Sequence, residues 1–415
     1  MAVGDRALVD RNPQLTFRAN AAAGRHGWLR LTPAYGVRLV RDKVRDLPPG
    51  SVVTDPFSGT GTTPLAAAEL GHVGQSVDVN PFLVWLGRAK TASYPLDVRD
   101  DVTAVSGSVV DLARHLVDDG DALWCPALHR IDRWWTPGAL LGLAALRRGI
   151  DVESPEGPVR DLLDLAFCRT LIGVSNAAFN HQSMSFRSSP DEPAVSAPAV
   201  ARATAGRFAD EVSALVVDAG HGLPGRAAVR QGDSRVALRD FEPCDLLLTS
   251  PPYVNRMSYI RELRPYMYWL RFLDAPPDAG RLDWRAIGGT WGTATSKLHT
   301  WEPETPTPVD DVLTAVCTRI RESGGKNGSV LATYVHKYFH DMWHHFLVAT
   351  AHVKPGGSVC YVVGNSSFYG NVVPAQEWYA EMMRSLGYRH VSVNTIRKRN
   401  SNKALFEYEV TATKP

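Results

Sequence analysis

The stretch Val52-Val53-Thr54-Asp55-Pro56-Phe57-Ser58-Gly59-Thr60-Gly61-Thr62-Thr63 decides how the rest of the chain is interpreted. Its apolar start follows Pro48-Pro49-Gly50, which predicts a short buried strand over 51–54. The glycines that follow lack Cβ atoms and permit positive φ, so the backbone can approach a ligand closely. An Ala- and Leu-rich helix is expected over 62–70, with Thr62 as a candidate cap and Gly71 at its end.

The next segment completes a strand–turn–helix–strand unit. Residues 73–79 predict a second strand that ends at Asp78-Val79-Asn80-Pro81, and residues 82–89 predict a helix. An acid at this strand tip suits the hydroxyls of a ribose, although a plain helix cap is the alternative for Asp78. The glycine spacing is not the G-x-G-x-x-G of dinucleotide sites, so a nicotinamide cofactor is a poorer fit.

A second motif, Thr249-Ser250-Pro251-Pro252-Tyr253, follows an apolar run over 245–249 that predicts a central parallel strand. Two consecutive prolines fix φ and remove two N–H donors, which leaves their carbonyls rigidly oriented. The remaining elements are expected as strands over 226–231 and 358–363, helices over 256–272 and 340–353, a turn at 355–357, and a hairpin formed by 390–396 and 404–410.

Composition limits the class of protein. The 415 residues are 44% hydrophobic and 21% charged, with a net charge of +2, as in ordinary globular proteins. The chain lacks a run of about 18 apolar residues and a signal-peptide pattern, so we expect a cytoplasmic protein without membrane contact. Five scattered cysteines without a C-x-x-C pair argue against a disulfide framework and a zinc site, and no metal is expected.

Taken together, the glycine loop and the Thr-Ser-Pro-Pro-Tyr corner resemble the S-adenosylmethionine-dependent DNA amino-methyltransferases, the cytosine-N4 and adenine-N6 family. The resemblance implies an α/β, Rossmann-like methyltransferase fold: a mostly parallel seven-stranded sheet with an antiparallel last strand, plus a largely helical insertion. It divides the chain into a core part with the cofactor loop (1–95), a helical insertion that is a candidate target-recognition region (96–225), and the remaining core (226–415), which contains a second insertion at about 274–326.

S-adenosyl-L-methionine is the cofactor that the resemblance implies. Its expected binding residues are Asp55, Phe57, Gly59, Gly61, Thr62, Asp78, Asn80 and Asp233. Asp233 is placed as the acid that bonds the adenine amino group, with a solvated turn residue as the alternative. The segment Thr32-Pro33-Ala34-Tyr35 resembles the part of the family that flanks the methionine end of the cofactor.

The expected catalytic residues are Ser250, Pro251, Pro252 and Tyr253. An exocyclic amine is a poor nucleophile because its lone pair is delocalised into the base. The Ser250 side chain and the Pro251 carbonyl would accept its hydrogens, and Tyr253 offers a ring on which a flipped base stacks. Transfer is then a direct displacement in which alignment supplies most of the acceleration.

Ser at the first position of the corner is similar to cytosine-N4 members, whereas Asp or Asn is more typical of adenine-N6 members. We therefore expect methylation of cytosine N4 in duplex DNA, with adenine N6 or an RNA base as alternatives, and a restriction-modification setting in which a separate endonuclease is possible. The alternative that is not an enzyme is a non-catalytic DNA-binding subunit that keeps the fold. Recognition is expected in segments 175–187 and 284–301, and phosphate contacts are expected from arginines and lysines at 256, 261, 264, 271, 397, 398, 399 and 403.

Overall fold

Strand β1 (Val52–Asp55) lies in the middle of the sheet, and all four of its residues are buried. It pairs in parallel with β2 (Val73–Asp78) on one side and with β6 (Cys244–Thr249) on the other. The structure is a computed structural model that describes residues 16–31, 34–120, 122–178, 185–186, 195–255, 258–289, 293–399 and 404–415.

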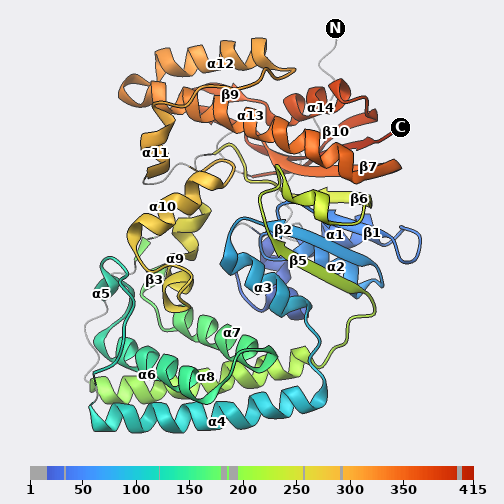
Figure 1. Ribbon diagram of the computed structural model, residues 1–415. Helices are drawn as coiled ribbons and strands as arrows, with labels where there is room; N and C mark the ends of the chain where they lie inside the picture. The colour runs from blue at the N-terminus through green and yellow to red at the C-terminus, as the bar shows by residue number, and fades with distance from the viewer. Residues whose placement is uncertain are drawn as a thin grey trace.

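The main sheet has seven strands in the order β10-β11-β7-β6-β1-β2-β5 (Figure 1). The other four strands are β5 (Arg226–Gln231), β7 (Val353–Gly364), β10 (Arg389–Lys398) and β11 (Phe406–Thr413). Strand β11 runs antiparallel to both of its neighbours, and the other pairs are parallel. The predicted mostly parallel seven-stranded sheet with an antiparallel last strand is therefore confirmed.

Helices cover both faces of the sheet. On one face, α1 (Val37–Val44) and α2 (Thr62–Glu69) pack against Leu246 and Leu248 of β6. On the other, α13 (Gly328–His352) and α14 (Ala375–Ser385) pack around Leu247. Strand β6 is thus buried on both sides, which explains its apolar sequence. This part of the chain also contains α3 (Pro81–Thr91) and three short 3-10 helices, η2 (Phe17–Ala22), η3 (Gly24–Gly27) and η4 (Ala237–Asp240).

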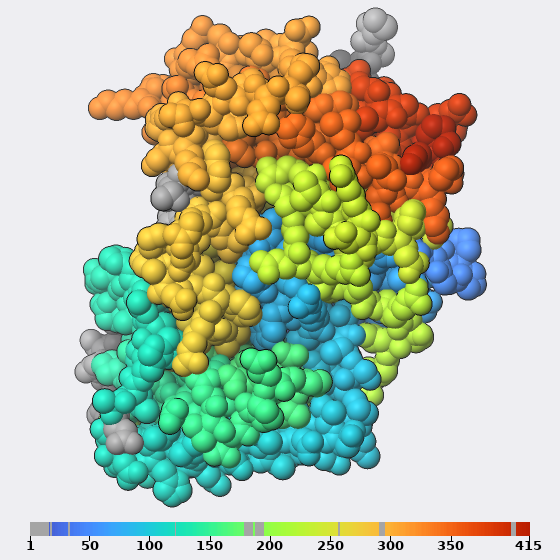
Figure 2. Space-filling view, in the orientation of Figure 1, coloured from blue at the N-terminus to red at the C-terminus, as the bar shows by residue number. Residues whose placement is uncertain are grey.

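A group of helices lies beside the sheet, in the lower part of Figures 1 and 2. It comprises α4 (Leu96–Asp119), α5 (Ile131–Trp134), α6 (Pro137–Glu153), α7 (Pro158–Gly173) and α8 (Ala197–Ala219), with two short strands, β3 (Ala177–Ala178) and β4 (Ser185–Phe186). Their apolar side chains share one core with α9 (Tyr259–Trp269), the helix that follows the Pro-Pro corner. This helix therefore connects the corner to the helical group.

The stretch between α9 and β7 forms α10 (Pro276–Arg285), α11 (Thr293–Leu298), α12 (Asp310–Ser323) and η5 (Gly325–Asn327). Helix α12 packs along α13, and a small hairpin of β8 (Ser366–Phe368) and β9 (Asn371–Val373) lies beside them. Among the helices of the described residues, none is long and apolar enough to cross a membrane.

Several boundaries differ from the expectations, by one residue at some strand ends and by more at the following three places. Helix α13 begins at Gly328, twelve residues before the predicted start at 340. Helix α9 begins at Tyr259 instead of 256, and Arg256 lies outside the described residues. The predicted turn at 355–357 is part of β7, where the pairing with β6 jumps from Cys244↔Val353 to Leu246↔Ser358. The turn-forming residues are accommodated there as an irregularity within the strand.

Candidate active site

The carboxyl ends of β1 and β6 are adjacent, and the sheet order reverses between them. Such a reversal is the place where doubly wound sheets bind ligands. Thr249 Oγ1 donates a hydrogen bond to Asp55 Oδ1 at 2.5 Å, and Thr63 Oγ1 donates to Asp55 Oδ2 at 2.7 Å. These two hydrogen bonds make Asp55 a link between the glycine loop and the Pro-Pro corner, and its side chain is fully buried.

Burial raises the pKa of Asp55 to about 6, and the hydrogen bonds from Thr249, Thr63 and the Phe57 backbone limit that rise. Tyr35 extends the network, because its hydroxyl bonds Thr63. Of the segment that was expected to flank the cofactor, Thr32 and Pro33 lie outside the described residues. A direct contact between Asp55 and a cofactor stays a prediction.

The glycine loop has the left-handed backbone that its residues permit. Gly59 has φ +50° and Gly61 has φ +75°. A Cβ on Gly61 would lie 3.1 Å from the Cα of Gly87 in α3, whereas a Cβ on Gly59 would meet only the Phe57 carbonyl oxygen, at 3.7 Å. Gly61 is therefore needed for close packing, and the space beside Gly59 is open to a ligand.

Thr62 does not cap helix α2, and this expectation was wrong. Gly61 holds the cap position without a side-chain bond, and Thr62 is the first residue of the helix. Its hydroxyl lies 3.1 Å from that of Thr60. The positive φ of Gly61 shifts the helix start by one residue relative to the sequence-based expectation.

Asp78 holds the glycine loop from the tip of β2. Its Oδ2 accepts the Gly59 N–H at 2.9 Å, and its Oδ1 accepts the Asn80 N–H at 2.9 Å. Burial raises the pKa of Asp78 to about 6. The helix cap is Asn80 instead, whose Oδ1 accepts the Phe82 N–H at 3.0 Å. Backbone hydrogen bonds from Gly59, Asn80 and Val79 use three of the acceptor positions of the Asp78 carboxylate, and a remaining lone pair would suit a ribose hydroxyl.

Asp233 is half-buried and paired. Arg235 donates to both of its oxygens, at 2.9 Å from Nε and 2.6 Å from Nη2, and also to Asp341 at 2.6 Å. Burial raises the pKa of Asp233, but the bond and charge of Arg235 outweigh this effect and the pKa is lowered. Nearby, the ring of Phe57 meets that of His345 edge-on with centroids 4.8 Å apart.

The Pro-Pro corner is fixed by residues from distant elements. Tyr338 of α13 donates to the Pro252 carbonyl at 2.7 Å. The Tyr253 hydroxyl donates to Glu407 Oε1 at 2.7 Å, and the guanidinium of Arg399 lies 5.1 Å from the centre of the Tyr253 ring. Burial and the Glu407 charge raise the pKa of Tyr253 well above its ordinary value, so the phenol stays protonated.

Ser250 lies within hydrogen-bonding reach of Tyr253, so the two predicted catalytic side chains are together. Sequence reasoning did not identify Glu407, Arg399 and Tyr338 as their partners. The predicted C-terminal hairpin places Glu407 near Arg397, and in the structure Arg397 Nε donates to Glu407 Oε2 at 2.6 Å.

Several residues expected to contact nucleic acid are engaged within the protein. Arg397 pairs with Glu407, Arg399 donates to the Asn365 carbonyl at 2.5 Å, and Arg271 pairs with Asp151 at 3.0 Å. Of the proposed recognition and phosphate-binding residues, 179–184, 187, 256, 290–292 and 403 lie outside the described residues.

Comparison with known proteins gives weak likenesses. No protein-family model matches the chain, and no curated protein matches it. TrmN from Thermus thermophilus aligns at 12% identity with a TM-score of 0.32. The alignment covers 96% of this chain but 52% of TrmN, so this chain spans about half the length of TrmN. Two structures of the rRNA methyltransferase aviRa from Streptomyces viridochromogenes align at 12% and 11% identity with TM-scores of 0.29 and 0.28, covering 98% of this chain and 95% of theirs. Likenesses at these scores do not identify an activity.

Proposed function

We propose that this chain transfers a methyl group from S-adenosylmethionine to an exocyclic amine of a nucleic-acid base, with cytosine N4 in duplex DNA as its substrate. The observation that carries the proposal is the hydrogen bond between Thr249 and Asp55, which holds the Ser-Pro-Pro-Tyr corner directly beside the glycine loop. Two motifs almost 200 residues apart thus form one site at the reversal of strand order.

The residues at the ends of β1 and β2 suit the proposed cofactor. The space beside Gly59 admits close backbone approach, and Asp78 keeps a lone pair for a ribose hydroxyl. Phe57 and Asp233 lie on the side assigned to adenine, where Asp233 is held in place by Arg235. Bound there, S-adenosylmethionine supplies an electrophilic methyl group, and the protein supplies binding and orientation.

The corner would align the amine of the base. The Pro252 carbonyl is occupied by Tyr338, so we assign the amine hydrogens to the Pro251 carbonyl and the Ser250 hydroxyl. Accepting both hydrogens returns electron density to the nitrogen and points its lone pair away from the ring. Because Arg399 lies against one side of the Tyr253 ring, a flipped base would stack on the other side.

Mass spectrometry of digested nucleosides tests the proposal, after incubation of the protein with S-adenosylmethionine and either duplex DNA or structured RNA. N4-methylcytosine from DNA is the expected product. N6-methyladenine would keep the acceptor chemistry and contradict the substrate inferred from Ser250. A product from RNA alone would move the activity to RNA, and the absence of any methylated base would contradict the proposal.

Two variants test the residue roles. Ser250→Ala should lower methyl transfer by about 100-fold, the scale for removing one positioned polar group from a transition state. Tyr253→Ala should lower it by about 10- to 100-fold, because it removes the ring on which the base would stack. Both should bind S-adenosylmethionine within about threefold of the wild type by calorimetry, because neither residue belongs to the cofactor loop. Ser213→Ala, on the exposed face of α8, is the control and should retain full activity. Unchanged transfer in both corner variants would contradict the catalytic assignment.

A further inference from the structure

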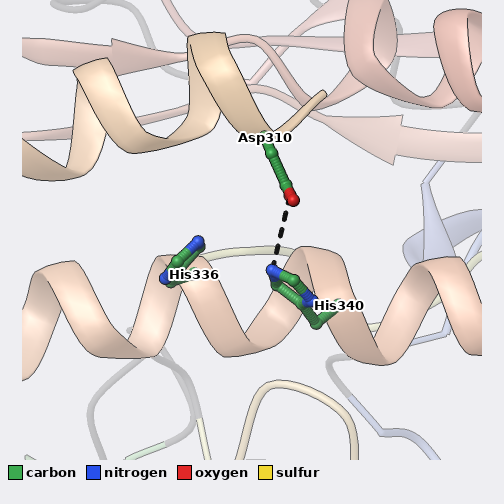
Figure 3. Close-up of side chains that lie close together, drawn as sticks. All are labelled: Asp310, His336 and His340. Carbon is green, nitrogen blue, oxygen red and sulfur yellow. Dashed lines mark ion pairs between the residues drawn. The ribbon is translucent and has the colours of Figure 1, made fainter. Parts of the chain in front are cut away.

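A group of potential metal ligands lies between α12 and α13, apart from the residues described above. Asp310 is the first residue of α12, and His336 and His340 lie one turn apart on α13. One ligand atom from each lies within 4.8 Å of the other two. Figure 3 shows the Asp310 carboxylate and both imidazoles facing the gap between the two helices.

His340 gives an independent sign that a ligand belongs there. It is 4% exposed, and neither of its ring nitrogens has a hydrogen-bond partner. Its Nε2 lies 3.5 Å from Asp310 Oδ1, a distance at which the two atoms do not form a hydrogen bond. A buried polar ring without partners is costly, and a coordinated cation would remove that cost.

The residues that contact the three candidate ligands are of the types that usually surround the ligands of a metal site. Thr307 orients the Asp310 carboxylate, with its N–H 3.0 Å from Oδ2 and its hydroxyl 2.6 Å from Oδ1. Trp301 meets both imidazoles edge-on, with centroids 5.8 Å from His336 and 5.6 Å from His340. Bonded carboxylates and apolar neighbours of this kind fix the geometry of ligands and limit the access of water.

We propose that Asp310, His336 and His340 bind one Zn²⁺ ion between α12 and α13. Two imidazole nitrogens and one carboxylate oxygen are ligands that zinc accepts, whereas Mg²⁺ and Ca²⁺ prefer oxygen ligands throughout. Three protein ligands leave a fourth position for water. The expectation of no metal rests on the spacing of the cysteines, whereas the donors of this site are His and Asp.

The ion would link the start of α12 to α13, the helix that also supports the Pro-Pro corner. Helix α13 carries Tyr338, which bonds Pro252, and Asp341, which pairs with Arg235. Zinc is therefore assigned a positioning and stabilising role. The inference does not depend on the proposed methyl transfer, because the ion is expected to bind whatever the substrate.

Zinc titration of the full-length protein tests the site. After removal of metals with a chelator, Zn²⁺ is added in competition with a chromophoric indicator. We expect one ion per chain with Kd below about 1 μM and a rise in Tm of several degrees, since a ligand that binds only the folded state stabilises it. His340→Gln and Asp310→Asn should each weaken binding by at least about 10-fold, and the double variant His336→Gln/His340→Gln should abolish it.

Two controls keep the outcome clear. His115→Ala, an exposed histidine of α4, should keep the wild-type affinity, which separates the site from binding at surface histidines. Circular dichroism checks that each variant is folded, and Co²⁺ added to the wild-type protein should give the visible absorption of a four- or five-coordinate ion. Failure of the wild type to bind Zn²⁺ would overturn the proposal. Unchanged stoichiometric binding in the folded double variant would also overturn it.

Discussion

Replacing Asp55 by Asn tests whether the link between the two motifs carries a buried charge. Asp55 is fully buried and accepts hydrogen bonds from Thr249, Thr63 and the Phe57 backbone. Asn keeps the size of the side chain and one carbonyl acceptor. Its amide group would face Thr63, whose hydroxyl has an alternative acceptor in the Leu248 carbonyl at 3.4 Å. The variant is therefore expected to fold.

The magnitude follows from the pKa of Asp55, which burial raises from 3.8 to about 6. Because a tenfold change in proton affinity is worth about 1.36 kcal/mol, ionisation of Asp55 costs the folded state about 3 kcal/mol. A carboxyl whose pKa is raised by folding contributes stability below pH 4, and that contribution is lost as the pH rises through about 6. The side-chain amide of the Asp55→Asn variant cannot ionise, so the variant avoids this loss.

The assay is urea unfolding of the wild type and Asp55→Asn between pH 4 and pH 8. The free energy of unfolding of the variant, relative to the wild type, should rise by about 2.4 kcal/mol between pH 4 and pH 7 and then level off. Asp46→Asn, at an exposed carboxylate, should follow the wild type throughout. A difference between Asp55→Asn and wild type that stays constant with pH, or that falls as pH rises, would refute the reasoning.

Three further substitutions test the packing and charges around the site. Gly61→Ala places a Cβ 3.1 Å from the Gly87 Cα at φ +75°, so urea unfolding should show a loss of about 1–3 kcal/mol, while Gly107→Ala in open space should show none. Glu407→Gln removes the buried charge that bonds Tyr253 and Arg397. It should lower methyl transfer, and it should lower the free energy of unfolding by about 1–3 kcal/mol. Wild-type values for both quantities would contradict the role assigned to Glu407. Burial lowers the pKa of Lys90 to about 7, so wild-type stability should rise between pH 7 and pH 10, and Lys90→Met should flatten that rise; an equal rise in the variant would contradict it.

The sheet could be predicted because its strands are short apolar runs bounded by glycine and proline. Strand β5 has the predicted bounds, and β1 and β6 differ from the predicted ranges by a single residue at their ends. The predicted turn at 355–357 lies within the bounds of β7, but its residues have no partner in the registers with β6 and β11 and Gly356 has φ +74°, so Pro-Gly-Gly forms an irregularity inside the strand.

The motifs of the site could be predicted, but their partners could not. Asp55 and Thr249 are 194 residues apart, and Tyr253 and Glu407 are 154 apart, so local spacing does not indicate either pair. The proposed zinc ligands illustrate what the sequence can and cannot indicate. His336 and His340 have the i, i+4 spacing of one helix face, which is visible in the sequence, but Asp310 comes from another helix and only the fold brings it near.

The contacts make the glycine loop and the corner parts of one rigid unit. Asp78 holds Gly59, Asp55 holds Thr249, and Tyr338 holds Pro252, so each end of the site is bonded to a buried or half-buried side chain. Group transfer by direct displacement depends on alignment to within a fraction of an ångström, and pre-formed bonds maintain that alignment without further ordering. A zinc ion on α13 would act on the same unit from outside, through Tyr338. Its removal would therefore loosen the corner while leaving the Asp78–Gly59 contact, and with it cofactor binding, intact.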